Sequence, residues 1–235
     1  MGWASGQLSP LNQLFIGYAA RFCRDASSPA LDLGTAYGAV ALSALEAGCH
    51  VIANDLDDAH LAVLLSQLDD ASRPRLSIRP GRFPREIAFP WASLGAVHAS
   101  NVFHFLTGNQ LDFGFRELAR WLRPGAKLFV QAATPFQQPF AAFLPEYSRR
   151  LRAGVKWPGW ITKLSAFSSH RQLSQMPRSI HLLDDGILSA AARRAGFEVE
   201  RAWLYRRPGL PASLHLDGRE SAALIARRPY TLSDA

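Results

Sequence analysis

The sequence is poor in cysteine and in long apolar segments. Its only cysteines, Cys23 and Cys49, are too few for a disulfide framework or a zinc site made of cysteines alone, and such economy is typical of the reducing cytoplasm. Residues 87–111 and 128–145 lack charged side chains but contain Pro, Asn or Gln, so they predict buried strands and loops rather than membrane spans. No basic residue precedes Arg21, which argues against a secretory signal.

The sequence also has few lysines, and its basic side chains are mostly arginines. The 26 Lys and Arg residues include only three lysines and outnumber the 19 Asp and Glu residues, so the net charge is +7. Residues 1–148 hold 11 basic and 12 acidic side chains, whereas residues 149–235 hold 15 and 7. The basic C-terminal part predicts either a solvated arginine-rich surface or an anionic substrate or partner.

Short apolar runs alternate with amphipathic stretches along most of the sequence. The 235 residues are 48% apolar and 19% charged, which predicts one large folded domain or a domain with an insertion. Expected strands cover residues 30–33, 51–53, 75–79, 94–99 and 127–132. Between them, residues 61–68 and 111–122 place their apolar side chains on one helical stripe. This alternation predicts a parallel sheet with helices on both faces.

The sequence beyond residue 134 departs from this rhythm. Residues 135–180 contain several prolines and, between Phe136 and Trp160, six aromatic residues, which predicts an inserted cap of short helices. A helix at 184–196 follows, with Asp184 and Asp185 as its expected caps. Strands at 197–205 and 221–226 come next without a helix between them, which predicts an antiparallel pair at the sheet edge. We therefore expect four parts, namely a helical segment at 1–27, a core at 28–134, a cap at 135–180 and a C-terminal part at 181–235.

The cap is far longer than an ordinary connection of about 4–6 residues. It follows the fifth expected strand, whose end borders the binding crevice in folds of this kind. One hypothesis is that residues 136–180 form a mobile lid, which closes over a bound molecule and excludes water. The alternatives are a rigid subdomain and a dimer contact.

The most informative motif is a glycine turn between a strand and a helix. Residues 32–38 read Asp-Leu-Gly-Thr-Ala-Tyr-Gly, and an acid, Asp55, ends the next expected strand. Glycines let the backbone approach a ligand closely, and an acid at that position accepts the hydroxyl groups of a ribose. The combination predicts a cofactor that contains adenosine. The structural alternatives are that Asp32 caps its own turn and that Asp55 caps the next helix, although Asp57 and Asp58 are also available as caps.

The same turn argues against a dinucleotide. A pyrophosphate-binding turn needs Gly-x-Gly-x-x-Gly, whereas here Thr35, Ala36 and Tyr37 separate Gly34 from Gly38 and the third glycine is missing. Asp32 also precedes the turn directly, and an acid there suits a cationic ligand rather than a phosphate. S-adenosylmethionine carries a sulfonium and an ammonium group and no phosphate.

Several segments resemble the class I S-adenosylmethionine-dependent methyltransferases. Residues 32–38 are similar to their first motif, residues 54–57 (Asn-Asp-Leu-Asp) to the segment with the ribose-binding acid, and residues 122–128 (Leu-Arg-Pro-Gly-Ala-Lys-Leu) to the turn before their fifth strand. Residues 184–197 resemble their last helix. The resemblance spans roughly residues 28–228 and implies an α/β fold: a doubly wound, seven-stranded, mostly parallel sheet with an antiparallel last strand and a helical insertion after strand 5.

The resemblance also implies a cofactor site for S-adenosyl-L-methionine. Asp32 and Gly34 are expected to face the methionine end, Asp55 to bind the ribose, and Leu56 to pack on the adenine. The family often has Gly-Asp after the third strand, where this sequence has Gly-Arg-Phe with Arg82. Because arginine accepts no hydrogen bond, adenine recognition is expected to rest on backbone groups and on Phe83. The expected cofactor-binding set is completed by Thr35, Ala36, Gly38, Arg82, Asn101 and Val102.

The methyl acceptor is expected beside the segment after the fourth strand. Residues 100–106 read Ser-Asn-Val-Phe-His-Phe-Leu and lack the prolines of the Asn-Pro-Pro-Tyr motif of amino-directed nucleic-acid methyltransferases. They look more like the Leu-His-His-Leu segment of small-molecule methyltransferases. His104 is therefore the candidate general base, since the reference pKa of histidine is about 6.5. The alternative is a histidine packed between Phe103 and Phe105.

Aromatic side chains are the remaining candidates for acceptor binding. Tyr147, Trp157 and Trp160 of the cap are expected to form an aromatic wall for a planar or cationic acceptor, and Tyr18 and Tyr37 are added as possible contacts. The alternative for the cap aromatics is that they form the core of the inserted helices, and Tyr37 has the alternative of packing over the glycine turn. The basic residues 149–152 are either a solvated helix face or an anion site.

These observations favour an enzyme that methylates an O or N atom of a small molecule. A protein-lysine or RNA methyltransferase is the alternative suggested by the basic C-terminal part, and steep salt dependence would mark the RNA enzyme. A non-catalytic scaffold is opposed by the complete set Asp32, Gly34, Gly38 and Asp55, and a nicotinamide-dependent dehydrogenase by the missing glycine. We expect no metal and no membrane partner. The identity of the acceptor, the methylated atom and the oligomeric state stay open at this stage.

Overall fold

The computed structural model describes residues 7–167 and 179–230 and contains a seven-stranded sheet. The strand order is β3-β2-β1-β4-β5-β9-β8. The strands are β1 (Ala30–Leu33), β2 (Val51–Asn54), β3 (Leu76–Ile78), β4 (Leu94–Ser100), β5 (Leu122–Ala133), β8 (Glu198–Tyr205) and β9 (Ser221–Arg227). This order brings the ends of β1 and β4, which are far apart in the sequence, next to each other.

The direction of the strands confirms the predicted sheet. Strands β3, β2, β1, β4 and β5 pair in parallel, and β9 pairs antiparallel with both β5 and β8. The sheet is therefore mostly parallel, with an antiparallel strand inserted near one edge. Asp32 on β1 is in register with His98 on β4, so their side chains project from the same face of the sheet.

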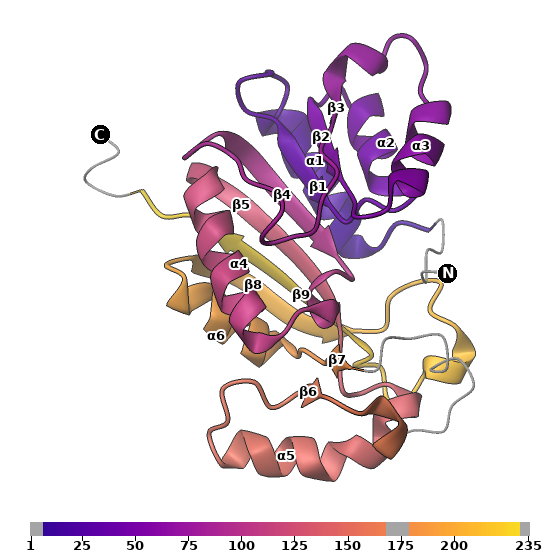
Figure 1. The fold of residues 1–235 in the computed structure, drawn as a ribbon, viewed down its shortest axis with the longest axis vertical. Helices are drawn as coiled ribbons and strands as arrows, with labels where there is room; N and C mark the ends of the chain where they lie inside the picture. Colours follow the sequence, from indigo (N-terminus) through magenta and orange to yellow (C-terminus); the bar gives the residue numbers. More distant parts are fainter. Residues whose placement is uncertain (1–6, 168–178, 231–235) are drawn as a thin grey trace.

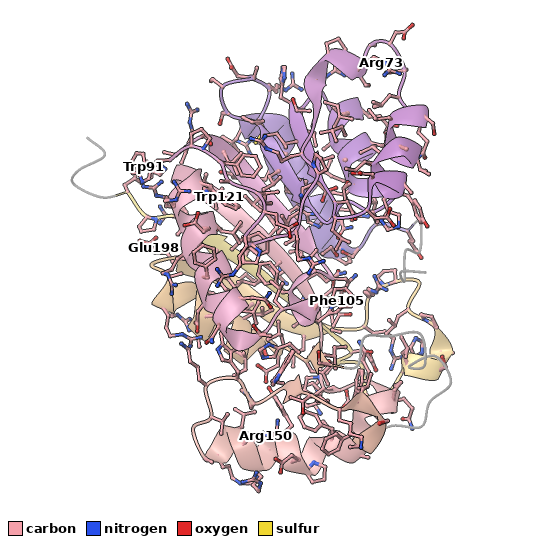
Figure 2. The ribbon with its side chains drawn as sticks, in the orientation of Figure 1. Arg73, Trp91, Phe105, Trp121, Arg150 and Glu198 are labelled. Atoms are coloured by element: carbon pink, nitrogen blue, oxygen red, sulfur yellow. The ribbon has the colours of Figure 1, made fainter. Side chains whose placement is uncertain are left out.

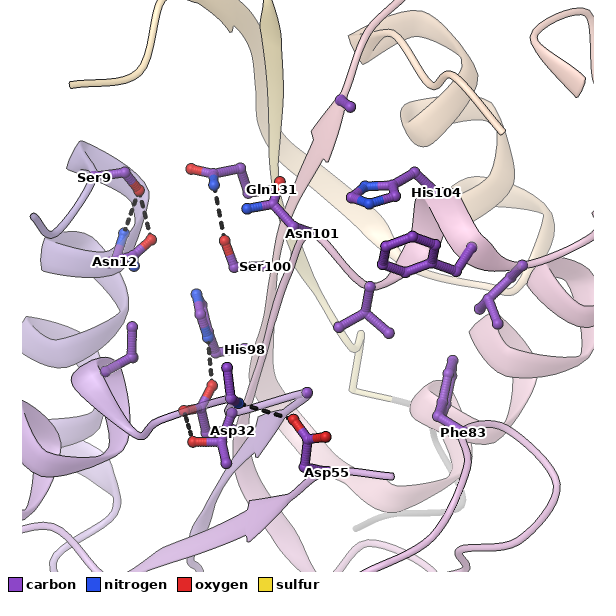
Figure 3. Close-up of a pocket in the computed structure, with 18 of the residues that line it drawn as sticks. Ser9, Asn12, Asp32, Asp55, Phe83, His98, Ser100, Asn101, His104 and Gln131 are labelled. Carbon is purple, nitrogen blue, oxygen red and sulfur yellow. Dashed lines mark hydrogen bonds and ion pairs between the residues drawn. The ribbon is translucent and has the colours of Figure 1, made fainter. Parts of the chain in front are cut away.

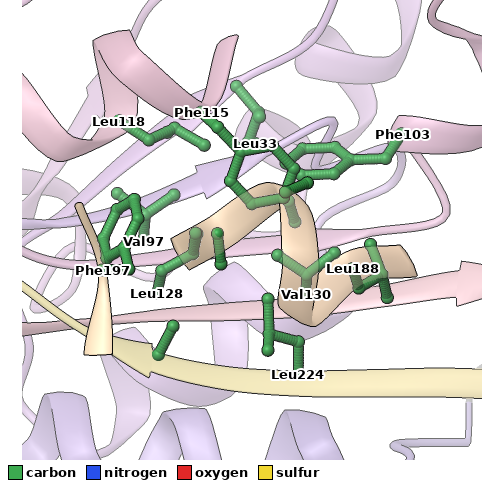
Figure 4. Packing of buried hydrophobic residues seen from close by; sticks show 14 of the residues in the cluster. Leu33, Val97, Phe103, Phe115, Leu118, Leu128, Val130, Leu188, Phe197 and Leu224 are labelled. Carbon is green, nitrogen blue, oxygen red and sulfur yellow. The ribbon is translucent and has the colours of Figure 1, made fainter. Parts of the chain in front are cut away.

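Helices cover both faces of the sheet, as predicted. Apolar side chains of α1 (Pro10–Phe22), α2 (Ala39–Glu46) and α3 (Asp58–Ser66) pack on one face, and those of α4 (Gly108–Trp121) and α6 (Asp185–Arg194) on the other (Figure 1). Figure 4 shows the second of these cores, where Leu33, Val97 and Val130 from the strands meet side chains from the helices. Burial of these apolar side chains is the main force that holds the layers together.

Local sequence signals explain where several helices begin. Asp57 caps α3 by accepting a hydrogen bond from the Ala59 N–H, and Asp184 caps α6 by accepting one from the Ile187 N–H. Thr107 and Gln110 form a capping box at the start of α4. The predicted cap residues Asp57 and Asp184 therefore act as expected.

The cap between β5 and α6 contains more than the predicted short helices. It comprises η3 (Gln138–Phe143), α5 (Leu144–Arg152), β6 (Trp160–Ile161), η4 (Leu164–Ala166) and β7 (Ile180–His181), and β6 and β7 pair as a small antiparallel sheet. In Figure 1, α5 and β6 lie beyond one end of the main sheet, and Figure 2 shows Arg150 on this outer helix. The cap has its own apolar cluster, which includes Phe143, Tyr147 and Leu164. The part of the predicted lid at 168–178 lies outside the described residues.

Strand β5 is longer than expected. Strand β5 begins at Leu122 rather than at the expected residue 127, and the register of the pair β4–β5 shifts between Leu94 and Ala96. The turn at Pro124 and Gly125 thus forms a bulge inside the strand.

None of the helices in the described ranges has the length and apolar character that a bilayer span requires.

Candidate functional site

A cavity of about 680 Å³ lies at the carboxyl ends of the central strands. This volume falls within the range of about 300–1,000 Å³ found for small-molecule sites. The lining comes from the turn after β1, the loops after β2, β3 and β4, the start of α1, and the segments that close the other side, η3 and η6 (Ala212–Leu214). Its place matches the crevice where open α/β sheets bind ligands.

The glycine turn forms one wall of this cavity. Gly34 has φ +68°, and a Cβ atom at this position would lie 2.3 Å from Val102 Cγ2. Gly38 has φ +86° and precedes α2. A Cβ atom at Gly38 would lie 2.3 Å from Leu64 Cδ1. Both positions therefore favour glycine for space and for conformation, because side chains are strained in the left-handed region. The turn thus brings backbone groups of residues 34–36 to the cavity.

Asp55 connects the turn after β1 to the loop after β2. Its Oδ2 accepts a hydrogen bond of 2.9 Å from the Ala36 N–H, and its Oδ1 accepts one of 3.0 Å from the Asp57 N–H. His60 Nδ1 lies 3.3 Å from the same Oδ1. Because Asp57 caps α3, Asp55 is not that helix's cap. Its carboxylate lines the cavity, where a ribose would meet it.

Asp32 joins the turn to the fourth strand. Its Oδ2 accepts a hydrogen bond of 2.7 Å from the Thr35 hydroxyl, so Asp32 does cap its own turn. Its Oδ1 lies 2.7 Å from His98 Nδ1. Both carboxylate oxygens are thus engaged at a residue that is only 2% exposed and lines the cavity. Figure 3 shows Asp32 between Asp55 and His98.

The expected adenine contacts lie at the end of the cavity beyond Asp55. Leu56 lines it and is 70% exposed, whereas Phe83 lines it from a buried position. The Phe83 ring stacks on Phe103 with an interplanar angle of 5°, so Phe83 offers a fixed apolar surface. Arg82 also lines the cavity, and its backbone N–H donates to Glu86.

The opposite end of the cavity carries polar groups beside β4 and β5. Gln131 donates a hydrogen bond of 2.8 Å to Ser100 Oγ and accepts one from the Tyr205 hydroxyl. Asn101 follows β4 with φ +60°, a conformation that asparagine tolerates better than most residues. Ser9, the N-cap of α1, and Asn12 in α1 form hydrogen bonds with each other beside this region. Together these groups form a polar floor for a ligand (Figure 3).

His104 also lines this end of the cavity. It is 7% exposed, and its Nδ1 has no hydrogen-bond partner within the described ranges 7–167 and 179–230. Burial, with a smaller contribution from Arg207, lowers the pKa of His104 to about 3. The ring contacts Phe105 with a centroid distance of 4.1 Å. The imidazole therefore stays neutral at neutral pH and offers a ring nitrogen to the cavity wall.

Apolar side chains and one arginine complete the cavity. Phe140 of the cap, Ile180 of β7 and Leu214 of η6 line its far side, and Phe105, which is 51% exposed, lines it as well. Arg207 follows β8 and lines the same region. Burial lowers the pKa of Arg207 from its ordinary value.

The structure does not bring five of the predicted substrate residues to this cavity. Tyr18 lines a separate groove beside α1 and the start of β5, and Tyr37 packs edge-on against His60, 45% exposed. Tyr147 is buried in the cap and donates a hydrogen bond to Asp184. Trp157 packs close to Gly108, and Trp160 contacts His181. The cap aromatics thus pack within the cap and against its neighbours, the alternative that the sequence left open.

Sequence reasoning also missed several cavity residues. They are Ser9, Asn12, His98, Gln131 and Arg207. One signal was available for His98, because a histidine inside the otherwise charge-free run at 94–100 is an unusual strand residue. The others come from α1, β5 and the segment after β8, whose closeness to the glycine turn depends on the sheet order.

The donor set of the cavity fits S-adenosyl-L-methionine. Asp32, Asp55 and Asp57 line the end where the cofactor is expected, so this end repels a pyrophosphate and suits a ligand with positive charges. The glycine at position 34 leaves room for a close backbone contact. A bound cofactor of this kind would supply an electrophilic methyl group on its sulfonium.

Comparisons with known proteins agree with this geometry. Residues 30–125 match a family model described as a methyltransferase domain. No curated protein matches the chain. Among solved structures, an S-adenosylmethionine-dependent methyltransferase from Mesorhizobium loti has 19% identity and TM-score 0.61, with 87% of this chain and 93% of that chain covered.

Two other solved structures are similar at comparable levels. A methyltransferase of the same kind from Methanosarcina mazei has 12% identity and TM-score 0.67, with 96% of this chain and 100% of that chain covered. The glycopeptide N-methyltransferase MtfA, in complex with S-adenosyl-L-homocysteine, has 15% identity and TM-score 0.58, with coverages of 93% and 87%. At these identities the similarity shows a shared fold. Residues 30–125 thus match a methyltransferase domain, and the chain shares its fold with S-adenosylmethionine-dependent methyltransferases.

Proposed function

We propose that the protein transfers the methyl group of S-adenosyl-L-methionine to an O or N atom of a small molecule bound at the far end of the cavity. The observation that carries this proposal is the set of apolar side chains that line the far end of the cavity, namely Phe140, Ile180, Leu210 and Leu214. This end lies on the other side of β4 from the ribose acid Asp55. A small acceptor fits such a pocket, whereas a polymer needs an open groove.

The pairing of the C-terminal arginines supports a small acceptor over RNA. Arg206 bonds to Glu220, Arg219 to Asp217, and Arg227 to Glu198, and on α5 both Arg149 and Arg150 bond to Glu146. Arginines that already bond to carboxylates have less to gain from phosphates. Several basic side chains of the C-terminal part are therefore already paired, and we propose that its charge serves solubility in the cytoplasm rather than RNA binding.

We assign His104 to holding the acceptor rather than to removing its proton. A general base works best when its pKa lies near the working pH, and burial lowers the pKa of His104 to about 3. Its neutral ring suits a hydrogen bond with a bound molecule. In the cofactor part of the cavity, we propose that Asp55 binds the ribose and that Leu56 and Phe83 contact the adenine. We propose that the turn from Gly34 to Gly38, together with Asn101 and Val102, contacts the rest of the cofactor.

A screen for release of S-adenosyl-L-homocysteine tests this proposal. The protein is incubated with S-adenosyl-L-methionine and a panel of phenols, carboxylic acids and amines, and in parallel with total RNA and with histone protein. We expect turnover with a small molecule. A Leu214→Trp variant should lose this turnover while still binding S-adenosyl-L-homocysteine, because the new side chain fills the acceptor end only.

The matched control is Leu151→Trp, since Leu151 is 43% exposed on α5 and does not line the cavity. This variant should turn over like the parent. Methylation of RNA or histone that Leu214→Trp leaves unchanged would show that the acceptor does not enter the cavity, and the proposal would then be wrong.

A further inference from the structure

His98 is a buried histidine, and one of its two ring nitrogens forms no hydrogen bond with the described part of the chain. The residue lies on β4 and is 1% exposed, yet it lines the cavity. Its Nδ1 lies 2.7 Å from Asp32 Oδ1. Its Nε2 is fully buried and has no hydrogen-bond partner within residues 7–167 and 179–230. An orphaned polar atom of this kind is costly unless something binds there.

The bond to Asp32 fixes which nitrogen carries the proton. A carboxylate only accepts hydrogen bonds, and the other oxygen of Asp32 already accepts from Thr35. Nδ1 must therefore be the donor, which leaves a lone pair on Nε2 when the ring is neutral. The Phe15 ring stacks on the imidazole at a centroid distance of 4.9 Å and holds its plane. Orientation and tautomer are thus both set before any ligand binds.

The place of the ring relates it to the reacting end of the ligand. Asp55 follows β2, Asp32 lies on β1, and His98 lies on β4. Because β1 lies between β2 and β4, two strand spacings, about 10 Å, separate the ribose acid from the histidine. Figure 3 shows the ring extending away from Asp32 toward the space between Asn12 and Ser100. Asn12, His98 and Ser100 all line the cavity.

We infer that His98 is the general base of the methyl transfer, with Nε2 receiving the proton of the acceptor and Asp32 holding the ring. This inference rests on the proposed function. As the acceptor's lone pair forms its bond to the methyl carbon, the methyl–sulfur bond breaks and its electron pair stays on sulfur. The acceptor's O–H or N–H proton passes to His98 Nε2, and the carboxylate of Asp32 stabilises the resulting imidazolium.

Charged and titratable groups near the His98 ring affect its protonation. Asp32 from β1 contacts the ring. Further titratable or charged groups line the same cavity, namely Asp55 from the loop after β2, His104 from η2 (Phe103–Phe105) and Arg207 from the segment after β8, and Tyr205 from β8 bonds to the lining residue Gln131. Helix α1 and strand β5 contribute uncharged side chains, namely Ser9, Asn12, Phe15, Phe129 and Gln131. Asp32 is the nearest charge to the ring in this set.

Nuclear magnetic resonance of the protein labelled with ¹⁵N at its histidines tests the first half of the inference without any acceptor. We expect His98 to carry its proton on Nδ1 and to show a bare Nε2 at neutral pH. In Asp32→Asn the tautomer should no longer be fixed, because an amide can also donate. A wild-type ring with its proton on Nε2 would overturn the inference, since that nitrogen could accept nothing.

Kinetics with an acceptor identified by the screen test the second half. His98→Asn keeps a donor near the Nδ1 position and deletes Nε2. We expect the variant to bind S-adenosyl-L-homocysteine normally, to lose about 10²-fold or more in catalytic rate at neutral pH, and to lose the acidic limb of the wild-type pH–rate profile. His50→Asn removes an imidazole at a position that does not line the cavity and should behave like the parent.

The outcomes separate the inference from the function on which it rests. Weakened binding of S-adenosyl-L-homocysteine in His98→Asn, with an unchanged rate at saturation and an unchanged acidic limb, would show that Nε2 accepts from the cofactor's ammonium and would overturn the inference. Loss of cofactor binding and of turnover in the wild-type protein would instead refute the proposed function. Normal binding with the rate and pH profile of the wild type would refute only the role of His98.

Discussion

At the residue scale, Asp55 both holds loops of the cavity together and presents its carboxylate to the cavity. It ties the glycine turn to the loop after β2 through the Ala36 and Asp57 N–H groups, and its carboxylate faces the cavity. Hydrogen bonds to a charged group contribute about 1.5–3 kcal/mol. The same carboxylate can therefore shape the cofactor site and bind the cofactor.

We expect Asp55→Ala to weaken S-adenosyl-L-homocysteine binding by about 1.5–3 kcal/mol, measured by calorimetry. Asp58→Ala is the matched control, since Asp58 is an exposed acid at the start of α3 that does not line the cavity. Equal affinities of the two variants would mean that the ribose is held by other groups.

His104 should make the protein sensitive to acid. Burial lowers its folded-state pKa from 6.5 to about 3, so below pH 6.5 the unfolded chain binds a proton that the folded protein does not. Stability should therefore fall as the pH decreases from about 6.5 toward 3, by up to about 1.4 kcal/mol per pH unit. His181, whose pKa burial lowers to about 4, adds to this loss in the same direction.

Urea unfolding at several pH values between 7.5 and 4.5 measures this effect. We expect His104→Gln to lose less stability over this range than the wild type, whereas His50→Asn should follow the wild type. The same slope for wild type and His104→Gln would show that the folded protein protonates His104 without penalty.

Single residues mark the limit of what the sequence predicts about the site. Asp32, Gly34 and Asp55 were identifiable because they lie in one contiguous strand–turn–helix–strand unit. His98 joins Asp32 across 66 residues of chain, and Arg207 reaches the cavity from the segment after β8. Their roles depend on β1 being the neighbour of β4 and on where β8 ends, neither of which is a local property of the sequence.

At the scale of elements, the glycine turn leaves little room for a side chain. We expect Gly34→Ala to destabilise the protein and weaken S-adenosyl-L-homocysteine binding, because the new Cβ would lie 2.3 Å from Val102 Cγ2. Gly154→Ala separates backbone strain from this clash, since Gly154 has nearly the same φ, +69°, with nothing within 4 Å of the new Cβ. Thermal melting of both variants gives the comparison, and equal losses would contradict the close contact.

Side-chain hydrogen bonds join parts of the described cap to one another and to the start of α6. Tyr147 donates to Asp184, and Arg150 donates to the carbonyl oxygens of Pro158 and Trp160. These contacts favour the rigid subdomain that the sequence left as an alternative for residues 136–167.

We therefore expect trypsin to cleave slowly between Arg149 and Lys163 in the ligand-free protein, and S-adenosyl-L-homocysteine to change the rate little. Mass spectrometry of the peptides locates each cut, so cleavage elsewhere does not confuse the result. Rapid cleavage within this stretch that ligand suppresses would restore the lid.

The sequence predicted the elements of the core better than those of the cap. Periodic apolar runs and cap residues such as Asp57 and Asp184 located the helices, and the strands of the core were expected within a few residues of their positions. Strands β6 and β7 are two residues each, too short for any periodicity, so they form only because the cap brings Trp160 and His181 together. The bulge in β5 likewise depends on its neighbour β4.

For the whole molecule, the sheet order explains the place of the cavity, and we propose that the charge distribution determines which ligands bind there. The carboxylates of Asp32, Asp55 and Asp57 gather at one end of the cavity, and Arg207 lies at the other. A ligand with positive charge at its methionine end and no phosphate suits the first end, and a small acceptor suits the second. Part of the basic charge in the C-terminal part is engaged in ion pairs.

Calorimetric titration of the protein with S-adenosyl-L-homocysteine and, separately, with NAD⁺ tests the central claim most directly. We expect S-adenosyl-L-homocysteine to bind with a stoichiometry of about one, as a single cavity of this volume requires, and NAD⁺ to give no measurable heat, because its pyrophosphate would face the three carboxylates. Tight binding of NAD⁺ with no response to S-adenosyl-L-homocysteine would contradict the assignment of this cavity to a methyltransferase.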